Sequence, residues 1–168
     1  MVLAWRNSDR VRASSYSDHV ITPDEHMAWF DRLQNNSTDV FMIFEIRETP
    51  FGVVQINRID KVNGTGHWGF YIGVEEAPRG TGSIMGLLGV EFAFIELGLR
   101  KIVGESFAFN QASIRFHLKL GFVEEGRLRK HVLKGEKYED IVVFGLLRSD
   151  WERNRMELEG SVFGSQGR

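Results

Sequence analysis

The feature that most constrains this chain is a glycine-rich turn between a strand-like segment and a strongly apolar helix. The turn occupies residues 73–83 and contains Arg79-Gly80-Thr81-Gly82, and an apolar run at 84–97 follows it. Glycine lets the backbone turn sharply and come close to a ligand, and the first turn of a helix offers unpaired N–H groups that favour a phosphate. The pattern is neither a dinucleotide fingerprint nor a P-loop. Alone, it predicts either an anion-binding loop or an ordinary strand-to-helix turn.

The size and composition are those of one globular domain. With 168 residues, 42% apolar and 26% charged, the chain can bury about two-thirds of its unfolded surface. A net charge of −2 without a basic block predicts no nucleic-acid or membrane partner, and the lack of cysteine excludes disulfides and thiolate chemistry. No secretion signal is visible, and the apolar run at 84–97 is too short to span a bilayer. We therefore expect a cytoplasmic protein.

The first half of the chain predicts helical segments and then an antiparallel meander. Residues 1–12 resemble the end of a helix, and a second helix is expected from Thr22 to about Leu33 because Thr, Pro and Glu form a helix-start signal there. Strands follow at 40–46, 51–59 and 67–73. Because short turns join these strands, they should be antiparallel neighbours.

The second half predicts a crossover and a hairpin. The helix at 82–97 leads to a strand at 101–107, which should run parallel to the strand at 67–73. A helix from Gln111 to about Leu120 has Asn110 as its N-cap and Gly121 as its stop. Strands at about 122–133 and 138–148 complete one α/β domain around a mixed sheet. We expect this domain to cover residues 1–150, followed by a partly disordered tail at 151–168.

Two motifs together resemble the GNAT family of N-acetyltransferases. They are the Arg79-Gly80-x-Gly82 turn and Asn110-x-x-Ser113-Ile114-x-Phe116-His117-x-Lys119-x-Gly121-Phe122. The resemblance covers about residues 5–148 and implies a mostly antiparallel mixed sheet with helices on both faces. It also implies an acetyl-CoA site, with the pantetheine arm between two splayed strands, one ending at Gly73 and one around Val103. The implied cofactor-binding residues are Gly73, Val74, Arg79, Gly80, Thr81, Gly82, Ser83, Ile84, Asn110 and Ser113.

Three departures from the family pattern affect these expectations. Ile84 stands where the family's loop usually ends in Gly or Ala, so the pyrophosphate contact there must rely on backbone amides alone. His117 stands where the family usually has Tyr. The chain starts where the family's first helix should be ending, so the family's first strand is expected to be missing and its neighbour to form an exposed edge.

The flanking segments resemble one subgroup of the family. The enzymes of this subgroup acetylate the 4-amino group of a UDP-linked amino sugar in pseudaminic acid synthesis, for flagellin glycosylation. The segments that resemble it are Trp5-Arg6-Asn7, Tyr16-Ser17-Asp18-His19, Ile21 with His26 and Trp29, and residues 124–130. The alternatives in the same class are a ribosomal-protein or peptide N-terminus and a polyamine. The alternative from another class is a non-catalytic acyl-CoA-binding sensor domain.

A nucleotide-sugar acceptor requires cations, an aromatic surface and hydrogen-bond donors. The residues of these types that the sequence offers as acceptor contacts are Arg6, Tyr16, His26, Trp29, Asn57, Arg58, His67 and Tyr71. Core packing is the alternative for the aromatic residues, and a solvated charge is the alternative for each arginine. The sequence leaves open the exact amine and the oligomeric state, a homodimer included.

Acetyl transfer to an amine requires a base, an oxyanion donor and an acid for the departing thiolate. Glu105 lies beside the expected cleft and is the candidate base, with an ion-pair partner as the alternative. His117 is the candidate acid because imidazole exchanges protons near neutral pH; the alternative is a surface histidine, with water as the acid. The backbone N–H of Val74 or a neighbour is the expected oxyanion donor. We expect no metal, since the five histidines are scattered along the chain.

Overall fold

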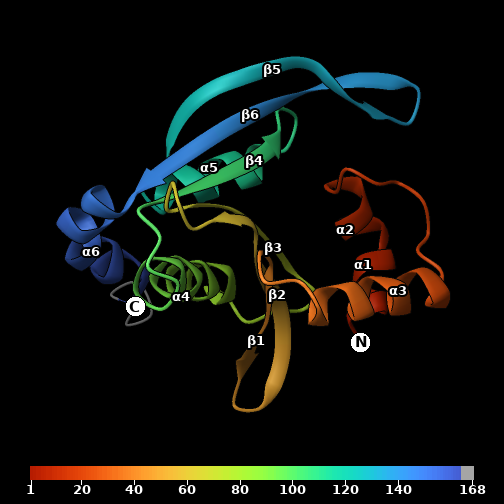
Figure 1. Cartoon of the computed structure of the whole chain (residues 1–168), viewed down its shortest axis with the longest axis horizontal. Helices are drawn as coiled ribbons and strands as arrows, with labels where there is room; N and C mark the ends of the chain where they lie inside the picture. The colour runs from red at the N-terminus through yellow and green to blue at the C-terminus, as the bar shows by residue number, and fades with distance from the viewer. Residues whose placement is uncertain (164–168) are drawn as a thin grey trace.

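The computed structural model describes residues 1–163 and shows a six-stranded sheet with helices against both of its faces (Figure 1). This confirms the predicted mixed, mostly antiparallel architecture. The elements are α1 (Val2–Asn7), α2 (Asp9–Ala13), α3 (Pro23–Gln34), β1 (Val40–Ile46), β2 (Thr49–Asp60), β3 (Thr65–Ile72), α4 (Thr81–Ile95), β4 (Lys101–Phe107), α5 (Gln111–Lys119), β5 (Val123–Lys134), β6 (Lys137–Leu147) and α6 (Arg148–Phe163).

The strand order of the sheet is β1-β2-β3-β4-β6-β5. Strands β3 and β4 are parallel, as the crossover through α4 predicted, and the other neighbouring pairs are antiparallel. Strand β1 lies at one edge of the sheet and β5 at the other. The β3–β4 pair therefore stands at the centre of the sheet.

Residues 1–13 form two short helices, so the prediction of one helix end at 1–12 was wrong. Ser8 separates the helices with an extended backbone, φ −63° and ψ 143°. Its hydroxyl accepts a hydrogen bond from the N–H of Val11 at 3.4 Å and caps α2. Serine is favoured at such a position because its side chain replaces the backbone acceptor that a new helix lacks.

Residues 148–163 form helix α6, which crosses the predicted domain boundary at residue 150. Trp151 is 3% exposed and its ring lies 5.4 Å from that of Phe94 in α4. Arg155 bonds the carboxylates of Glu91 in α4 and Glu159 in α6. This helix was not predicted, and it packs on the domain instead of forming an irregular tail. The disorder predicted at the end of the tail falls on residues 164–168, outside the described residues.

The main core lies between the sheet and helices α4 and α5. Its fully buried side chains include Phe94 on α4, Ile102 on β4 and Phe144 on β6. Helices α1, α2 and α3 lie toward the opposite face, where Trp29 of α3 packs edge-on against Phe41 of β1. Within residues 1–163, no helix combines the length and apolar character needed to cross a membrane.

Candidate active site

The parallel strands β3 and β4 pair at one end and separate at the other. Their ladder begins at Thr65 and Lys101 and ends at Trp68 and Gly104. Beyond that point β3 continues to pair with β2, and β4 continues to pair with β6. The splay implied by the family resemblance is therefore present, and Glu105 is the first β4 residue beyond the ladder.

Unpaired peptide groups of β3 line this gap. In an antiparallel ladder, alternate residues direct their N–H and C=O groups toward the partner strand. Gly73 donates its N–H to the carbonyl of Phe51 at 2.7 Å, so the alternation directs the N–H groups of Phe70 and Ile72 toward the gap. The sequence placed the oxyanion donor at Val74 or a neighbour, and this alternation favours Ile72.

A cavity of about 1110 Å³ lies at the gap, and residues from elements on both faces of the sheet line it. Gly82 and Ser113 border it on the side of α4 and α5, and Arg6, Trp29 and Tyr71 border it on the side of α1–α3. This lining offers contacts for one ligand on the side of α4 and α5 and for another on the side of α1–α3, on either side of the gap.

The turn before α4 presents two free backbone N–H groups. Gly80 has φ 90°, a left-handed conformation that glycine adopts without strain, and α4 begins at the next residue. Thr81 and Ile84 each donate their N–H to a carbonyl of the turn at 3.1 Å. Among the described residues, the N–H groups of Gly82 and Ser83 have no acceptor. These two amides, at the positive end of α4, form the anion-binding part of the turn.

The free amides refine the predicted cofactor contacts. The N–H of Ile84 donates to the carbonyl of Gly80 at 3.1 Å and is engaged within the helix, so the free amides at the turn are those of Gly82 and Ser83; the pyrophosphate contact by the loop amides stays a prediction. Lys119 of α5 donates from Nζ to Ser83 Oγ at 3.0 Å and places a cation beside the turn. Asn110 uses its Oδ1 to cap α5 at the N–H of Ser113, at 3.1 Å, as predicted. Of the predicted cofactor residues, Gly82, Asn110 and Ser113 line the cavity.

Helices α1 and α2 hold the end of β3 in place. The Trp5 ring packs so closely on Gly73 that a Cβ there would lie 1.9 Å from it. Arg10 donates to the carbonyls of Ile72 and Val74 at 2.8 and 3.0 Å. Gly73, predicted as a cofactor contact, is thus required for the approach of Trp5. Arg10 was not singled out from the sequence, because its partners lie 62 and 64 residues away.

Glu105 is the carboxylate at the opening of the gap. Its Oε2 accepts a hydrogen bond from Tyr16 Oη at 2.5 Å, and its Oε1 lies 4.0 Å from His67 Nδ1. The Glu105 side chain is 29% exposed, so solvent and a ligand in the cavity can reach it. Burial and the adjacent carboxylate raise the pKa of Tyr16 well above its ordinary value, which keeps the phenol protonated at neutral pH.

His117 is buried inside an aromatic cluster, so the alternative of a surface histidine was wrong. It is 1% exposed and stacks on Phe144 with ring centroids 4.6 Å apart. Its Nε2 accepts from Trp68 Nε1 at 3.1 Å, and its Nδ1 lies 2.8 Å from the carbonyl of Ser113. Because indole only donates and a carbonyl only accepts, the ring is neutral with its proton on Nδ1. Burial lowers the pKa of His117. The acid role of His117 stays a prediction, and this geometry directs no proton into the cavity.

The residues predicted for the acceptor all border the same cavity. They are Arg6, Tyr16, His26, Trp29, Asn57, Arg58, His67 and Tyr71. On α3, His26 stacks on Trp29 with centroids 5.1 Å apart, which gives the cavity a flat aromatic wall. On β3, burial raises the pKa of Tyr71 to about 12, while the nearby charge of Arg6 opposes the rise.

The charged lining of the cavity is mainly cationic. The arginines are Arg6, Arg10, Arg32 and Arg58, and the carboxylates are Glu25 and Glu105. Both carboxylates already have partners: Glu25 accepts from the N–H of Thr22 at 2.7 Å, and Glu105 accepts from Tyr16. In contrast, Nη1 of Arg6 is buried without a hydrogen-bond partner among the described residues. An unpaired buried donor of this kind favours an acceptor group supplied by a ligand.

The β5–β6 hairpin contacts the segment that carries Tyr16. Figure 1 shows the hairpin extending over the sheet toward α2. Lys134 donates to the carbonyls of Arg12 and Ser15 at 2.7 and 2.6 Å and pairs with the carboxylate of Asp18. The loop after α2 is thus fixed from the hairpin side. Sequence reasoning missed this contact because 122 residues separate Lys134 from Arg12.

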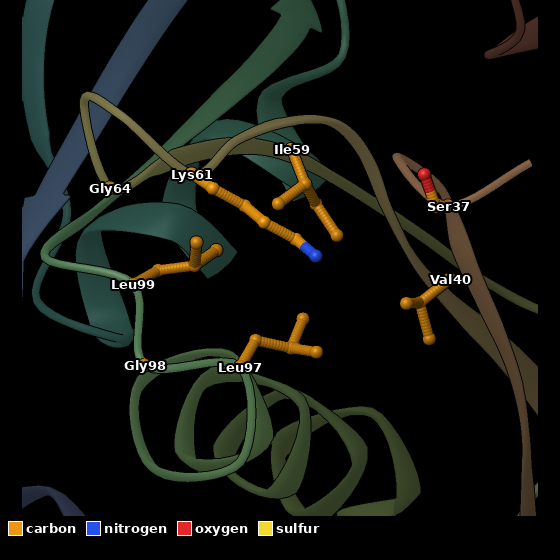
Figure 2. Close-up of a pocket in the computed structure, with 8 residues that line it drawn as sticks. All are labelled: Ser37, Val40, Ile59, Lys61, Gly64, Leu97, Gly98 and Leu99. Atoms are coloured by element: carbon orange, nitrogen blue, oxygen red, sulfur yellow. The ribbon is translucent and has the colours of Figure 1, made fainter.

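A smaller pocket of about 240 Å³ lies at the paired end of β3 and β4, beside the end of α4. Figure 2 shows the Lys61 side chain extending into it between Leu97 and Val40. Among the described residues that line it, Lys61 carries the single charge. A base for amine chemistry is absent from this lining, so the larger cavity is the candidate active site.

The splayed β3–β4 pair, the glycine turn before α4 and the carboxylate at the opening are the features that the family resemblance implied. The chain belongs to the GNAT acetyltransferase family: the family described as "Acetyltransferase (GNAT) domain" matches residues 1–123. As a member of this family the protein is a GNAT N-acetyltransferase, and acetyl-CoA is the acetyl donor that the family uses. The free amides of Gly82 and Ser83, Lys119 beside them and the gap between β3 and β4 fit this donor.

Among relatives, the chain is 34% identical over 128 residues to the SPbeta prophage-derived uncharacterized N-acetyltransferase YokL of Bacillus subtilis, covering 75% of this chain and 71% of that protein. It is 27% identical over 101 residues to the putative ribosomal N-acetyltransferase YdaF of the same organism, covering 60% and 55%. Its fold resembles that of spermidine N-acetyltransferase from Vibrio cholerae in complex with CoA and spermine, with a TM-score of 0.84 at 17% identity over 90% of both chains.

Proposed function

We propose that the protein acetylates the terminal amino group of a peptide or protein by direct attack of the amine on acetyl-CoA. The observation that carries this proposal is the cavity through the β3–β4 gap, with Glu105 at its opening and a mainly cationic lining on the acceptor side. A peptide acceptor is supported by the likeness to a relative named as a putative ribosomal N-acetyltransferase. A neutral or acidic peptide suits this lining.

The same lining argues against a polyamine acceptor. A polyamine carries several positive charges, and like charges brought together in a partly desolvated site cost binding free energy. Arg6, Arg32 and Arg58 would face such a ligand, and Glu25 and Glu105 are the two carboxylates in the lining that could offset them. The resemblance to the spermidine enzyme of Vibrio cholerae is one of fold.

A UDP-linked amino sugar is the second candidate acceptor. The unpaired Nη1 of Arg6 and the stacked pair of His26 and Trp29 favour it, because a diphosphate needs cations and a uracil stacks on an aromatic wall. The relatives described above do not support this acceptor by name. The support for a UDP-linked amino sugar is that these contacts provide the groups that such a ligand requires.

Different residues of the chain have different roles in the proposed acetyl transfer. When bound, acetyl-CoA supplies the thioester under attack. The amides of Gly82 and Ser83, with Lys119, would hold its pyrophosphate, and the N–H of Ile72 would donate to the oxyanion. Glu105 takes the proton from the acceptor amine. The Trp5 and Arg10 contacts keep the Ile72 peptide group aligned with the gap.

The test is release of free thiol from acetyl-CoA with a panel of acceptors: a peptide beginning with Ser, the same peptide with an acidic second residue, a UDP-amino sugar and spermidine. We expect the highest kcat/KM with a peptide and the lowest with spermidine. A preference for spermidine would overturn the acceptor assignment, and a preference for the UDP-amino sugar would select the second candidate. Thiol release with none of the four would overturn the proposed function.

A further inference from the structure

Tyr16 stands at the opening of the gap, in contact with the candidate base. Its hydroxyl bonds Glu105 at 2.5 Å, and its ring lies edge-on to Phe107, with centroids 5.6 Å apart at 74°. The Tyr16 residue is 47% exposed and borders the cavity. The contacts of Lys134 with Ser15 and Asp18 hold the residues on both sides of Tyr16. The phenol is thus fixed beside the carboxylate while remaining accessible from the cavity.

We propose that Tyr16 is a catalytic residue: its hydroxyl protonates the leaving thiolate, in a proton relay with Glu105. This inference rests on the proposed function. The amine nitrogen bonds the thioester carbonyl carbon and gives one proton to Glu105, and the carbon–sulfur bond breaks. The hydroxyl proton of Tyr16 passes to the sulfur, and Glu105 passes the amine's proton to the Tyr16 oxygen. The products are an amide and a thiol, and both side chains return to their starting states.

The other titratable groups near the gap are less suited to this step. His117 presents no proton to the cavity, because both of its ring nitrogens are engaged by Trp68 and Ser113. His67 of β3 lies on the other oxygen of Glu105, at 4.0 Å. Tyr71 lies near Arg6, deeper on the α1 side. Tyr16, in contrast, donates its hydroxyl proton directly to the candidate base Glu105 in a hydrogen bond.

The charge on Glu105 sets the order of the two transfers. Burial, the hydrogen bond to Glu105 and the charge of Glu105 all raise the pKa of Tyr16, while Arg58 of β2 lowers it. When Glu105 takes the amine's proton it becomes neutral, so the contributions from its charge disappear and Tyr16 becomes a stronger acid. The phenol therefore keeps its proton until the amine has lost one. This order suits a thiolate that leaves after the amine has attacked.

The test compares Tyr16→Phe with Tyr138→Phe, which makes the same chemical change at an exposed tyrosine of β6 outside the cavity. The Phe ring keeps the packing on Phe107 and removes the proton. We expect Tyr16→Phe to lower kcat by about 10²-fold, as for loss of a general acid, with KM near the wild-type value. Tyr138→Phe should match the wild type. A kcat for Tyr16→Phe within about twofold of the wild type would overturn the inference, because loss of a general acid costs far more.

Two further measurements test the relay, and the first separates an acid from a residue that merely positions Glu105. With an acetyl thioester of thionitrobenzoate, whose thiolate leaves without a proton, the defect of Tyr16→Phe should shrink; an undiminished defect overturns the acid role. In the free protein, ultraviolet titration should show a tyrosine with raised pKa that Tyr16→Phe removes and Tyr138→Phe retains. If Tyr16→Phe removes no titration of this kind, that result would also contradict the relay. If the wild type releases no thiol with any acceptor, the proposed function is overturned instead. The two failures can be told apart, because one is measured on the wild type and the other on Tyr16→Phe.

Discussion

The two ends of the β3–β4 pair differ although the same two strands form both. At the closed end, four residues of each strand pair, ending at Trp68 and Gly104. The bond from Trp68 to His117 lies directly over Gly104, where a Cβ would come within 2.5 Å of His117 Nε2. At the open end the ladder stops, and the polar groups of Glu105 and Tyr16 meet a cavity. The closed end stabilises the sheet, and the open end keeps peptide and side-chain groups free for a ligand.

The largest expected effect concerns the base at the open end. Glu105→Gln keeps the shape of the side chain but removes its ability to take a proton, so kcat/KM should fall by about 10² to 10³-fold. The measurement is thiol release across a pH series, in which the rise of the wild-type rate with pH should flatten. Glu124→Gln on exposed β5 is the matched control and should behave as the wild type. An unchanged pH profile for Glu105→Gln would remove Glu105 as the base.

The next effect concerns the space at the closed end. Gly104→Ala places a Cβ against His117 Nε2 and Trp68 Nε1, at 2.5 and 2.8 Å, and overpacking of this kind costs about 1–3 kcal/mol. Urea denaturation should show this loss in the free energy of unfolding. Gly126→Ala is the control, because nothing lies within 4 Å of its added Cβ. Equal stability of the two variants would contradict the tight contact at the closed end.

The third prediction distinguishes a structural role of His117 from a role as the general acid. His117→Phe leaves the buried Trp68 N–H unpaired, which costs about 1–3 kcal/mol. Because burial lowers the folded-state pKa of His117, the unfolded chain binds the proton more readily, and wild-type stability falls as the pH drops below about 6.5. The variant should lack this part of the acid dependence. The matched control is His131→Phe on exposed β5, which should retain it.

For His117 the kinetic result is as informative as the stability. If the folded His117→Phe protein retains a kcat close to that of the wild type, the structural role is supported. A loss of kcat as large as that of Tyr16→Phe, with the fold intact, would instead restore the sequence prediction that His117 is the acid.

The smallest effect concerns the hairpin contact with the open end. Lys134→Met removes the donor to Arg12, Ser15 and Asp18, so the segment with Tyr16 loses one of its restraints. We expect kcat to fall by about threefold, as for a slight misplacement of a reacting group. Lys137→Met, at the exposed start of β6, should leave kcat unchanged. A loss of kcat equal to that of Tyr16→Phe would mean that Lys134 does more than position the loop.

The sequence predicted the elements whose signals are local. The capping box at Thr22 and the N-cap Asn110 each depend on residues a few positions apart, and both are present in the structure. The parallel β3–β4 pair followed from a single topological rule. Helix α6 was missed because its Arg- and Glu-rich composition resembles a solvated tail, and its burial depends on Phe94, far away in the chain.

The sequence predicted which residues border the candidate site, but not how these residues contact one another. Residue types placed Glu105 and Tyr16 among the candidates. The two residues are 89 positions apart, however, and no local pattern showed that they would share a hydrogen bond. His117 was predicted as an acid because imidazole titrates near neutral pH. Its actual surroundings depend on Trp68, 49 residues earlier, which needs an acceptor for its buried N–H. Contacts over such separations carry no signal in a single sequence.

Hydrogen exchange of the backbone amides, with and without CoA, tests most directly that the open end of β3 and β4 is the cofactor site. We predict slower exchange on CoA binding at Gly82, Ser83 and Ile72, with no change at the closed end, Thr65 to Trp68. Protection around Lys61 and Leu97, or protection absent from Gly82 and Ser83, would contradict this account.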